Sequence, residues 1–131
     1  MKRGNLVLIR FSALFSVIGA VLGAHMAGSG SYAFRPIHAH ILVVGWLTLF
    51  AWGVYYEIFT ITSKKLAVGH TWTAIIGTTG LVLGMWVYYL KPFDFSEGLS
   101  LGLYIGGGVT LLISFILFFI TTFFIAKKED K

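Results

Sequence analysis

Hydrophobic residues dominate this chain in four long runs that are separated by short polar breaks. A window of about 20 residues, the length of helix that crosses a bilayer, resolves each run. The runs cover residues 6–26, 37–61, 66–90 and 99–125. We therefore predict an all-α membrane protein with four transmembrane helices.

The breaks between the runs cover residues 27–31, 62–65 and 91–97. Connections this short place consecutive helices antiparallel to each other. The third break is the clearest, because it contains Pro92, which ends a helix. No long polar linker divides the chain, so we expect residues 1–131 to form one four-helix domain.

The composition agrees with a membrane location. Hydrophobic residues make up 57% of the chain and charged residues 11%, whereas soluble domains carry about 25% charged residues. The absence of cysteine excludes disulfides, thiolate ligands, Fe–S clusters and covalently attached c-type haem. Lys2 and Arg3 precede an apolar run that is too long for the core of a signal peptide, so we expect a retained first helix.

The basic residues sort by side of the membrane. With four spans, eight of the ten fall on one side: Lys2, Arg3, Arg10, Lys64, Lys65, Lys127, Lys128 and Lys131. Only Arg35 and Lys91 fall on the other side. Positive charge is retained on the cytoplasmic side, so we expect both termini there, in a bacterial or archaeal cytoplasmic membrane. The excess of basic residues thus indicates the membrane topology, and no nucleic-acid partner is expected.

Small residues recur at helical spacing in three of the runs. They are Gly19 and Gly23, then Gly77, Gly80 and Gly84, then Gly102 and Gly106. In lipid, such strips let helices approach closely, or they leave room for a flat cofactor. We favour helix packing. We also expect Glu57 to reach the cytoplasmic interface, and we expect an aromatic stripe to face lipid: Phe115, Phe118, Phe119, Phe123 and Phe124.

Two histidines, His38 and His40, open the second apolar run. Alternate helical residues lie about 200° apart, so these two rings point to opposite faces. Ionisable groups within a membrane are costly and usually functional. His25 ends the first run on the same outer side, whereas His70 lies about 25 Å from His38 along the membrane normal. We predict a metal site from His38, His40 and His25, and a structural role for His70.

Imidazole binds haem iron, copper and zinc. The apolar setting, the glycine at Gly45 and the rings of Trp46 and Trp52 favour haem. Arg35 lies one turn before His38, where it could pair with haem propionates. The alternative is that both histidines are interfacial and hydrogen-bonded to the loop backbone.

The segment from His38 to Trp46, with the Gly53-Val54-Tyr55-Tyr56 tail, resembles the tenth helix of subunit I of the haem–copper oxidases. The segment that begins Gly69-His70-Thr71-Trp72 resembles the start of the eleventh helix. Arg35-Pro36-Ile37-His38 is similar to a low-spin haem-ligand motif on the second helix of some members. The resemblance implies that haem is bound non-covalently through His38 and His40, on opposite faces of one helix.

Subunit I has twelve helices in three arcs of four, so this chain has the size of one arc. It lacks a separate helix with the histidine and cross-linked tyrosine of the copper site, and it lacks the adjacent His-His pair. We therefore expect a homotrimer that rebuilds the twelve-helix ring. Haem would lie between subunits, with His38 of one protomer and His40 of the next at the shared interface.

The expected function is that of a b-type haem protein that transfers electrons, or that binds or reduces a diatomic gas such as O₂ or NO. If the protein is an enzyme, we expect an oxidoreductase of the haem–copper oxidase or NO reductase type. A respiratory electron donor would supply its electrons. Copper is a second candidate cofactor. The alternatives are a haem-free copper- or zinc-binding protein, and an assembly or structural subunit of a respiratory complex.

Overall fold

The computed structural model describes residues 3–126, and it is helical almost throughout. The elements are α1 (Arg3–Ser29), α2 (Arg35–His40), η1 (Ile41–Thr48), α3 (Leu49–Ile58), α4 (Lys64–Leu90), α5 (Glu97–Thr121) and η2 (Thr122–Phe124). Because α2, η1 and α3 follow one another without a break, they form one long helix. The described chain therefore contains four helices that are long and apolar enough to cross a membrane, which confirms the predicted all-α class.

The helix ends differ from the predicted ends by a few residues, and local chemistry explains where they lie. The long second helix stops at Ile58, three residues earlier than predicted, because Phe59 turns to an extended conformation. Ser63 and Ser96 cap α4 and α5, and their hydroxyls accept hydrogen bonds from the backbone N–H of Leu66 and Leu99. α4 ends where Lys91 adopts a left-handed conformation before Pro92.

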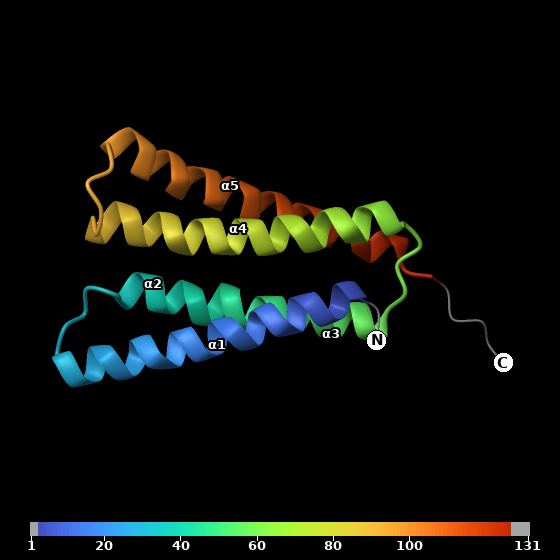
Figure 1. Ribbon diagram of the computed structural model, residues 1–131. Coiled ribbons are helices and arrows are strands. Elements are labelled where there is room, and N and C mark those ends of the chain that lie inside the picture. The colour runs from blue at the N-terminus through green and yellow to red at the C-terminus, as the bar shows by residue number, and fades with distance from the viewer. Residues whose placement is uncertain (1–2, 127–131) are drawn as a thin grey trace.

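The four helices form two antiparallel hairpins (Figure 1). One pairs α1 with the α2–η1–α3 helix, and the other pairs α4 with α5. The 59–63 connection joins the hairpins, at the end where α1 begins and α5 finishes. The antiparallel order expected from the short breaks is confirmed. At the same end, backbone hydrogen bonds from Thr62 to Phe124 and from Ala126 to Thr60, both 2.8 Å, tie the connection to the end of α5.

The closest packing in the molecule lies between α4 and α5, where backbones meet at glycines. A Cβ atom on Gly77 would meet the backbone of Leu111, and one on Gly84 would meet the backbone of Tyr104. Gly107 lies directly against Gly80 and Leu81. The strip at residues 77, 80 and 84 therefore serves helix packing, as predicted. In lipid, which is as apolar as the side chains, such contact is a principal source of helix association.

The first hairpin also uses glycines, but side chains rather than backbone cover them. Gly19 is covered by Leu42, Gly23 by His38 and Gly45 by Phe15. The Gly19/Gly23 pair is thus a packing surface, as favoured. Gly102 and Gly106 differ: nothing lies within 4 Å of a Cβ atom at either position. The glycine of α5 that packs on α4 is Gly107, one residue beyond the spacing that the sequence pattern singled out.

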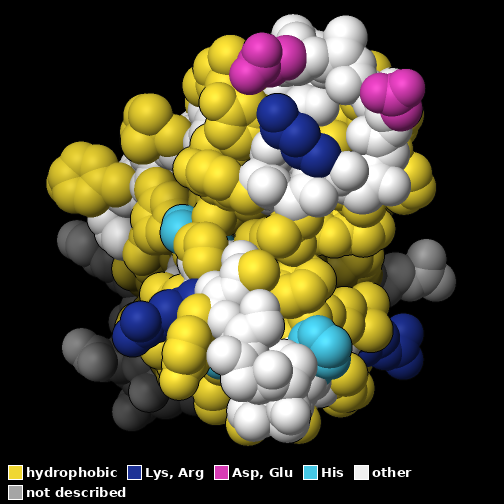
Figure 2. Space-filling model, turned by 90° about the vertical axis from the view of Figure 1, so that its left-hand side faces the viewer, with side chains coloured by type: hydrophobic (Ala, Val, Ile, Leu, Met, Phe, Trp, Pro, Cys, Tyr) yellow, Lys and Arg dark blue, Asp and Glu magenta, His cyan; other side chains and the backbone are white. Residues whose placement is uncertain are grey.

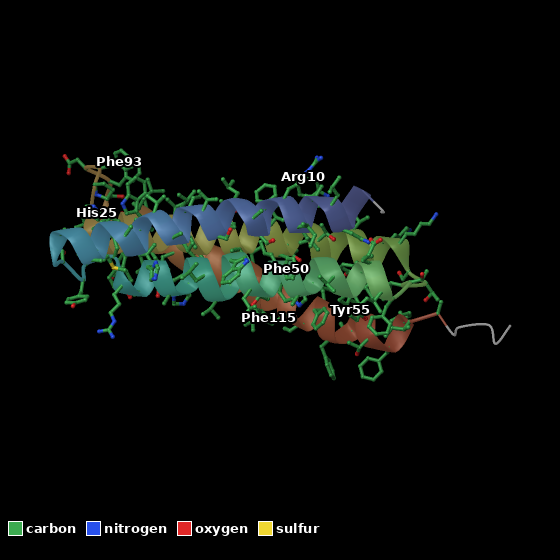
Figure 3. The ribbon with its side chains drawn as sticks, turned by 90° about the horizontal axis from the view of Figure 1, so that it is seen from below. Arg10, His25, Phe50, Tyr55, Phe93 and Phe115 are labelled. Atoms are coloured by element: carbon green, nitrogen blue, oxygen red, sulfur yellow. The ribbon has the colours of Figure 1, made fainter. Side chains whose placement is uncertain are left out.

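Large hydrophobic side chains are exposed along every long helix, as a lipid-facing surface requires. Examples are Val21 at 62%, Phe50 at 46% and Ile116 at 51% exposure. Figure 3 shows Phe50 and Phe115 on the outside of the ribbons. The aromatic stripe of α5 is mostly exposed, but Phe118 is not: it packs against the core. The prediction that this stripe faces lipid is therefore wrong for Phe118, whose helical position turns it toward α3.

The glycine contact predicts a sharp difference between two neighbouring residues. Gly107→Ala places a methyl group against the α4 backbone, so we expect it to destabilise the fold by about 1–3 kcal/mol, the usual cost of overpacking. Gly106→Ala is the matched control, because its methyl group enters open space, and it should change stability by less than about 1 kcal/mol. Thermal unfolding in detergent measures both. Equal effects of the two substitutions would contradict the close contact.

Candidate functional site

His38 faces the inside of its own hairpin. Its ring lies over Gly23 of α1, with Cε1 3.0 Å from the position that a Cβ atom on Gly23 would take. The Nδ1 atom is buried and has no hydrogen-bond partner within the described structure. A buried polar atom without a partner is costly and uncommon in a folded protein. His38 is therefore half-buried against α1, with one ring nitrogen that no group among the described residues satisfies.

His40 lies on the other side of the helix, as the two-residue spacing requires. Its Nδ1 is 2.8 Å from the carbonyl oxygen of Pro36. A carbonyl can only accept, so Nδ1 carries the proton and the neutral ring keeps its lone pair on Nε2. A backbone carbonyl that orients one ring nitrogen is the usual support of a histidine that binds metal through the other. His40 thus has its Nε2 lone pair available to bind a metal.

His25 and Arg35 are exposed at the same end of the molecule. The ring of His25 meets Phe34 edge-on at 5.9 Å, and the guanidinium of Arg35 lies 5.8 Å from the centre of the Tyr32 ring. Within residues 3–126, no three His, Asp or Glu side chains gather closely enough to hold a metal ion. The structure therefore does not assemble His25, His38 and His40 into one metal centre, because His38 and His40 point to opposite sides of their helix.

The other residues that the sequence predicted to lie beside a cofactor are Gly45, Trp46 and Trp52, and they differ in exposure. Trp46 is 45% exposed and borders the outer surface of the second helix. Gly45 is covered by Phe15 of α1, which occupies the space that a cofactor would need. Trp52 is only 3% exposed and packs on His70. The structure thus leaves Arg35 and Trp46 exposed and His40 half-buried, and it encloses Gly45 and Trp52 in the helix core.

The helix widens directly after His40. Residues Ile41–Thr48 form a π-helix, and the N–H of Leu49 reaches back to the carbonyl of Val44. The Thr48 hydroxyl also bonds the carbonyl of Val43, five residues earlier, at 2.8 Å. A π-helical turn holds more residues than an α-helical turn, and such turns occur frequently at functional sites. It changes the register between His40 and the residues that follow, which α-helical periodicity could not predict.

The end that carries these histidines has both basic and acidic side chains. Arg35 is exposed there, as are Lys91, Asp94 and Glu97 in and beside the connection between α4 and α5, and Figure 2 shows basic, acidic and histidine side chains on this face. Arg10, near the start of α1, and Lys64 and Lys65, at the start of α4, are exposed toward the opposite end. Lys2, Lys127, Lys128 and Lys131, which the sequence prediction also used, lie outside the described residues.

A second histidine environment lies where the two hairpins meet. His70 of α4 is fully buried, and its Nδ1 is 2.8 Å from the hydroxyl of Tyr56 in α3. Its ring also packs against Trp52, at 4.6 Å between centres, and against Phe118, at 5.6 Å. His70 thus joins α3, α4 and α5, which is the structural role predicted for it.

The other ring nitrogen of His70, Nε2, is buried and has no hydrogen-bond partner in the described chain. Tyr56 donates to Nδ1 in the tautomer that carries its proton on Nε2, and it accepts from Nδ1 in the other tautomer. In either case the Tyr56 hydroxyl is the one hydrogen-bond partner of the ring in the described chain.

Pattern analysis missed the Tyr56–His70 pair. The two residues are 14 positions apart in sequence, on either side of a helix break, so no helical periodicity relates them. It also missed a hydrogen bond of 2.9 Å from the Asn5 side chain to Glu57, which joins the start of α1 to the end of α3. The one available signal was the presence of polar residues near the ends of apolar runs. Glu57 is exposed and accepts this hydrogen bond from Asn5; its predicted place at the cytoplasmic interface stays a prediction.

Comparison of the chain with protein-family models, curated proteins and solved structures finds no match. The likeness to oxidase subunit I thus remains a prediction from the residues that carry it.

The Tyr56–His70 hydrogen bond can be tested by removing one hydroxyl. Tyr56→Phe leaves the buried Nδ1 of His70 without a partner, so we expect a loss of about 1–3 kcal/mol of stability. Tyr55→Phe is the matched control, because the Tyr55 hydroxyl accepts only a long 3.4 Å contact from Thr121. Thermal unfolding of both variants in detergent is the measurement. A control that loses as much stability as Tyr56→Phe would contradict the assignment.

Proposed function

We propose that this protein is a membrane-embedded b-type haem protein in which His40 is an axial ligand. The observation that carries the proposal is the 2.8 Å hydrogen bond between His40 Nδ1 and the Pro36 carbonyl, which leaves Nε2 as a lone-pair donor. The adjoining π-helix and the resemblance of residues 35–80 to oxidase subunit I support the same function.

Three groups of this chain have distinct parts in such a site. His40 would hold the haem iron through Nε2, and the hydrogen bond to the Pro36 carbonyl would orient its ring. Arg35, exposed five residues earlier, supplies a cation for propionate groups. Trp46 offers an exposed aromatic wall. The chemistry that haem supplies when bound is one-electron transfer, or gas binding where an axial position stays open.

His38 has a different part in this proposal from the one that the sequence suggested. Since its ring lies over Gly23 of its own chain, it faces α1, and His40 alone points away from that helix. We propose that haem lies on the His40 side, between protomers of a homotrimer of four-helix units. With both termini on the cytoplasmic side, this site is in the outer leaflet of the membrane.

The haem proposal is tested by a reduced-minus-oxidised absorption spectrum of the purified protein, expressed with haem supplied. We expect the sharp α and Soret bands of b-type haem, and we expect His40→Ala to lose at least 90% of them. Added imidazole should restore part of the signal, because it replaces the missing ligand without repairing a folding defect.

His25→Gln serves as the matched control, because His25 is exposed at the same end and contacts Phe34 only through its ring edge. It should keep its haem. If the wild-type protein is colourless and carries stoichiometric copper or zinc, the haem proposal is overturned and the protein binds that metal instead. A colourless and metal-free wild type that co-purifies with respiratory subunits would indicate a structural role.

The trimer is tested by measuring the protein mass of the haem-loaded preparation in detergent. We expect a mass close to three chains, and we expect His40→Ala to weaken the assembly if haem bridges the protomers. Light scattering coupled to gel filtration separates protein mass from bound detergent. A monomer that retains haem would contradict the trimer while leaving His40 as a ligand.

A further inference from the structure

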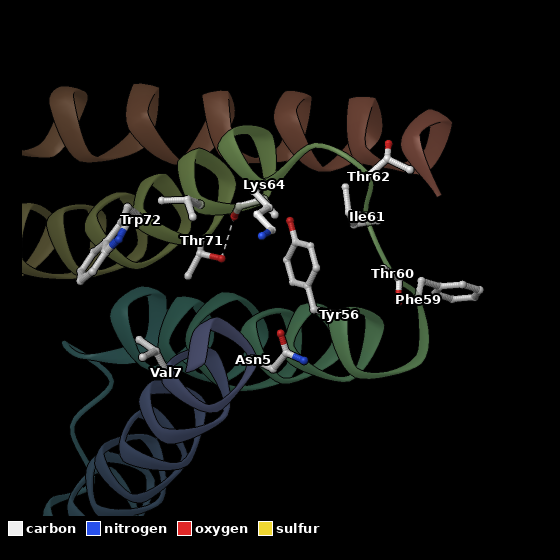
Figure 4. A pocket seen from close by; sticks show the side chains of 12 residues that line it. Asn5, Val7, Tyr56, Phe59, Thr60, Ile61, Thr62, Lys64, Thr71 and Trp72 are labelled. Atoms are coloured by element: carbon white, nitrogen blue, oxygen red, sulfur yellow. Dashed lines mark hydrogen bonds between the residues drawn. The ribbon is translucent and has the colours of Figure 1, made fainter. Parts of the chain in front are cut away.

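A pocket lies at the opposite end from His40, between the two hairpins. It encloses about 650 Å³, within the usual range of ligand sites. Its walls come from the start of α1, the end of α3, the 59–63 connection and the first two turns of α4 (Figure 4). Most of the surface is apolar, from side chains such as Val7, Ile61 and Val68.

The polar residues of the pocket are mostly engaged within the protein. Tyr56 bonds His70, Asn5 bonds Glu57, Thr62 bonds the Phe124 carbonyl and Thr71 bonds the Ala67 carbonyl, at 2.8–3.1 Å. Because these side chains are already hydrogen-bonded within the protein, they offer no strong contact to a bound molecule. Lys64 is the one cation in the lining, and Figure 4 shows its side chain directed into the pocket beside Tyr56.

An apolar track leads away from Lys64 along α4. Val68, Trp72 and Ile76 follow at four-residue intervals and are 56%, 53% and 58% exposed. Residues four apart lie on one helix face, so the stripe from 64 to 76 runs about 18 Å along the axis. That length is comparable with one leaflet of the hydrocarbon core, about 15 Å. The stripe begins at a cation and continues as exposed apolar surface.

We propose that this pocket binds one anionic phospholipid, with its phosphate at Lys64 and an acyl chain along Val68, Trp72 and Ile76. Charge complementarity selects the headgroup, because an uncharged or zwitterionic one leaves the lysine without a net counter-charge. The end that carries Lys64 and Lys65 is also the expected cytoplasmic end, where anionic lipids gather. This site is independent of the haem proposal.

Native mass spectrometry of the full-length protein in detergent tests the site, with dioleoyl phosphatidylglycerol and dioleoyl phosphatidylcholine as probes. We expect one phosphatidylglycerol per chain to be retained preferentially. Lys64→Gln should weaken phosphatidylglycerol binding about fivefold, the effect of one cation beside an anionic lipid, and leave phosphatidylcholine binding unchanged.

Lys65→Gln is the matched control, because it removes the same charge one residue away and Lys65 does not line the pocket. It should weaken phosphatidylglycerol binding less than twofold. Ala67→Phe fills the pocket without changing charge and should weaken binding as strongly as Lys64→Gln. Equal effects of the two lysine substitutions, equal retention of both lipids, or an uncharged quinone bound in place of lipid would each overturn the proposal.

Discussion

The buried hydrogen bond between Tyr56 and His70 links α3 of one hairpin to α4 of the other. Contacts between the hairpins are few beside those within each one. The fully buried His70 ring is enclosed by Trp52, Tyr56 and Phe118. A buried polar group that loses its partner is costly, so this bond favours one arrangement of α3 against α4. Tyr56 also lines the pocket that contains Lys64, so the same bond positions one wall of that pocket.

The molecule separates its chemistry into two ends. One end holds the half-buried His40 and the exposed Arg35, with acidic residues close by in the 91–97 connection. The opposite end holds Lys64, Lys65 and an apolar pocket. Between them lies an aromatic cluster around Trp52 and His70. The proposed haem and lipid sites therefore do not share residues, and each can be lost without the other.

Glycine has two uses in this fold, and their energetics differ. Between α4 and α5, glycines allow backbone to touch backbone, where any side chain would force the helices apart. Between α1 and the second helix, glycines receive the side chains of Leu42, His38 and Phe15, so a flexible neighbour can absorb part of a substitution. The α4–α5 contact is the more extensive one.

The sequence alone determined the class of fold, because four apolar runs of bilayer length and their short breaks allow few arrangements in lipid. It also determined that His38 and His40 lie on opposite faces, since helical geometry fixes that angle. Only the tertiary structure decided which face each one occupies: His38 turned to Gly23 and His40 turned away. The π-helix, the choice of Gly107 over Gly106 and the pairing of Tyr56 with His70 were likewise outside the reach of pattern analysis. They depend on contacts between segments distant in sequence, which local periodicity does not encode.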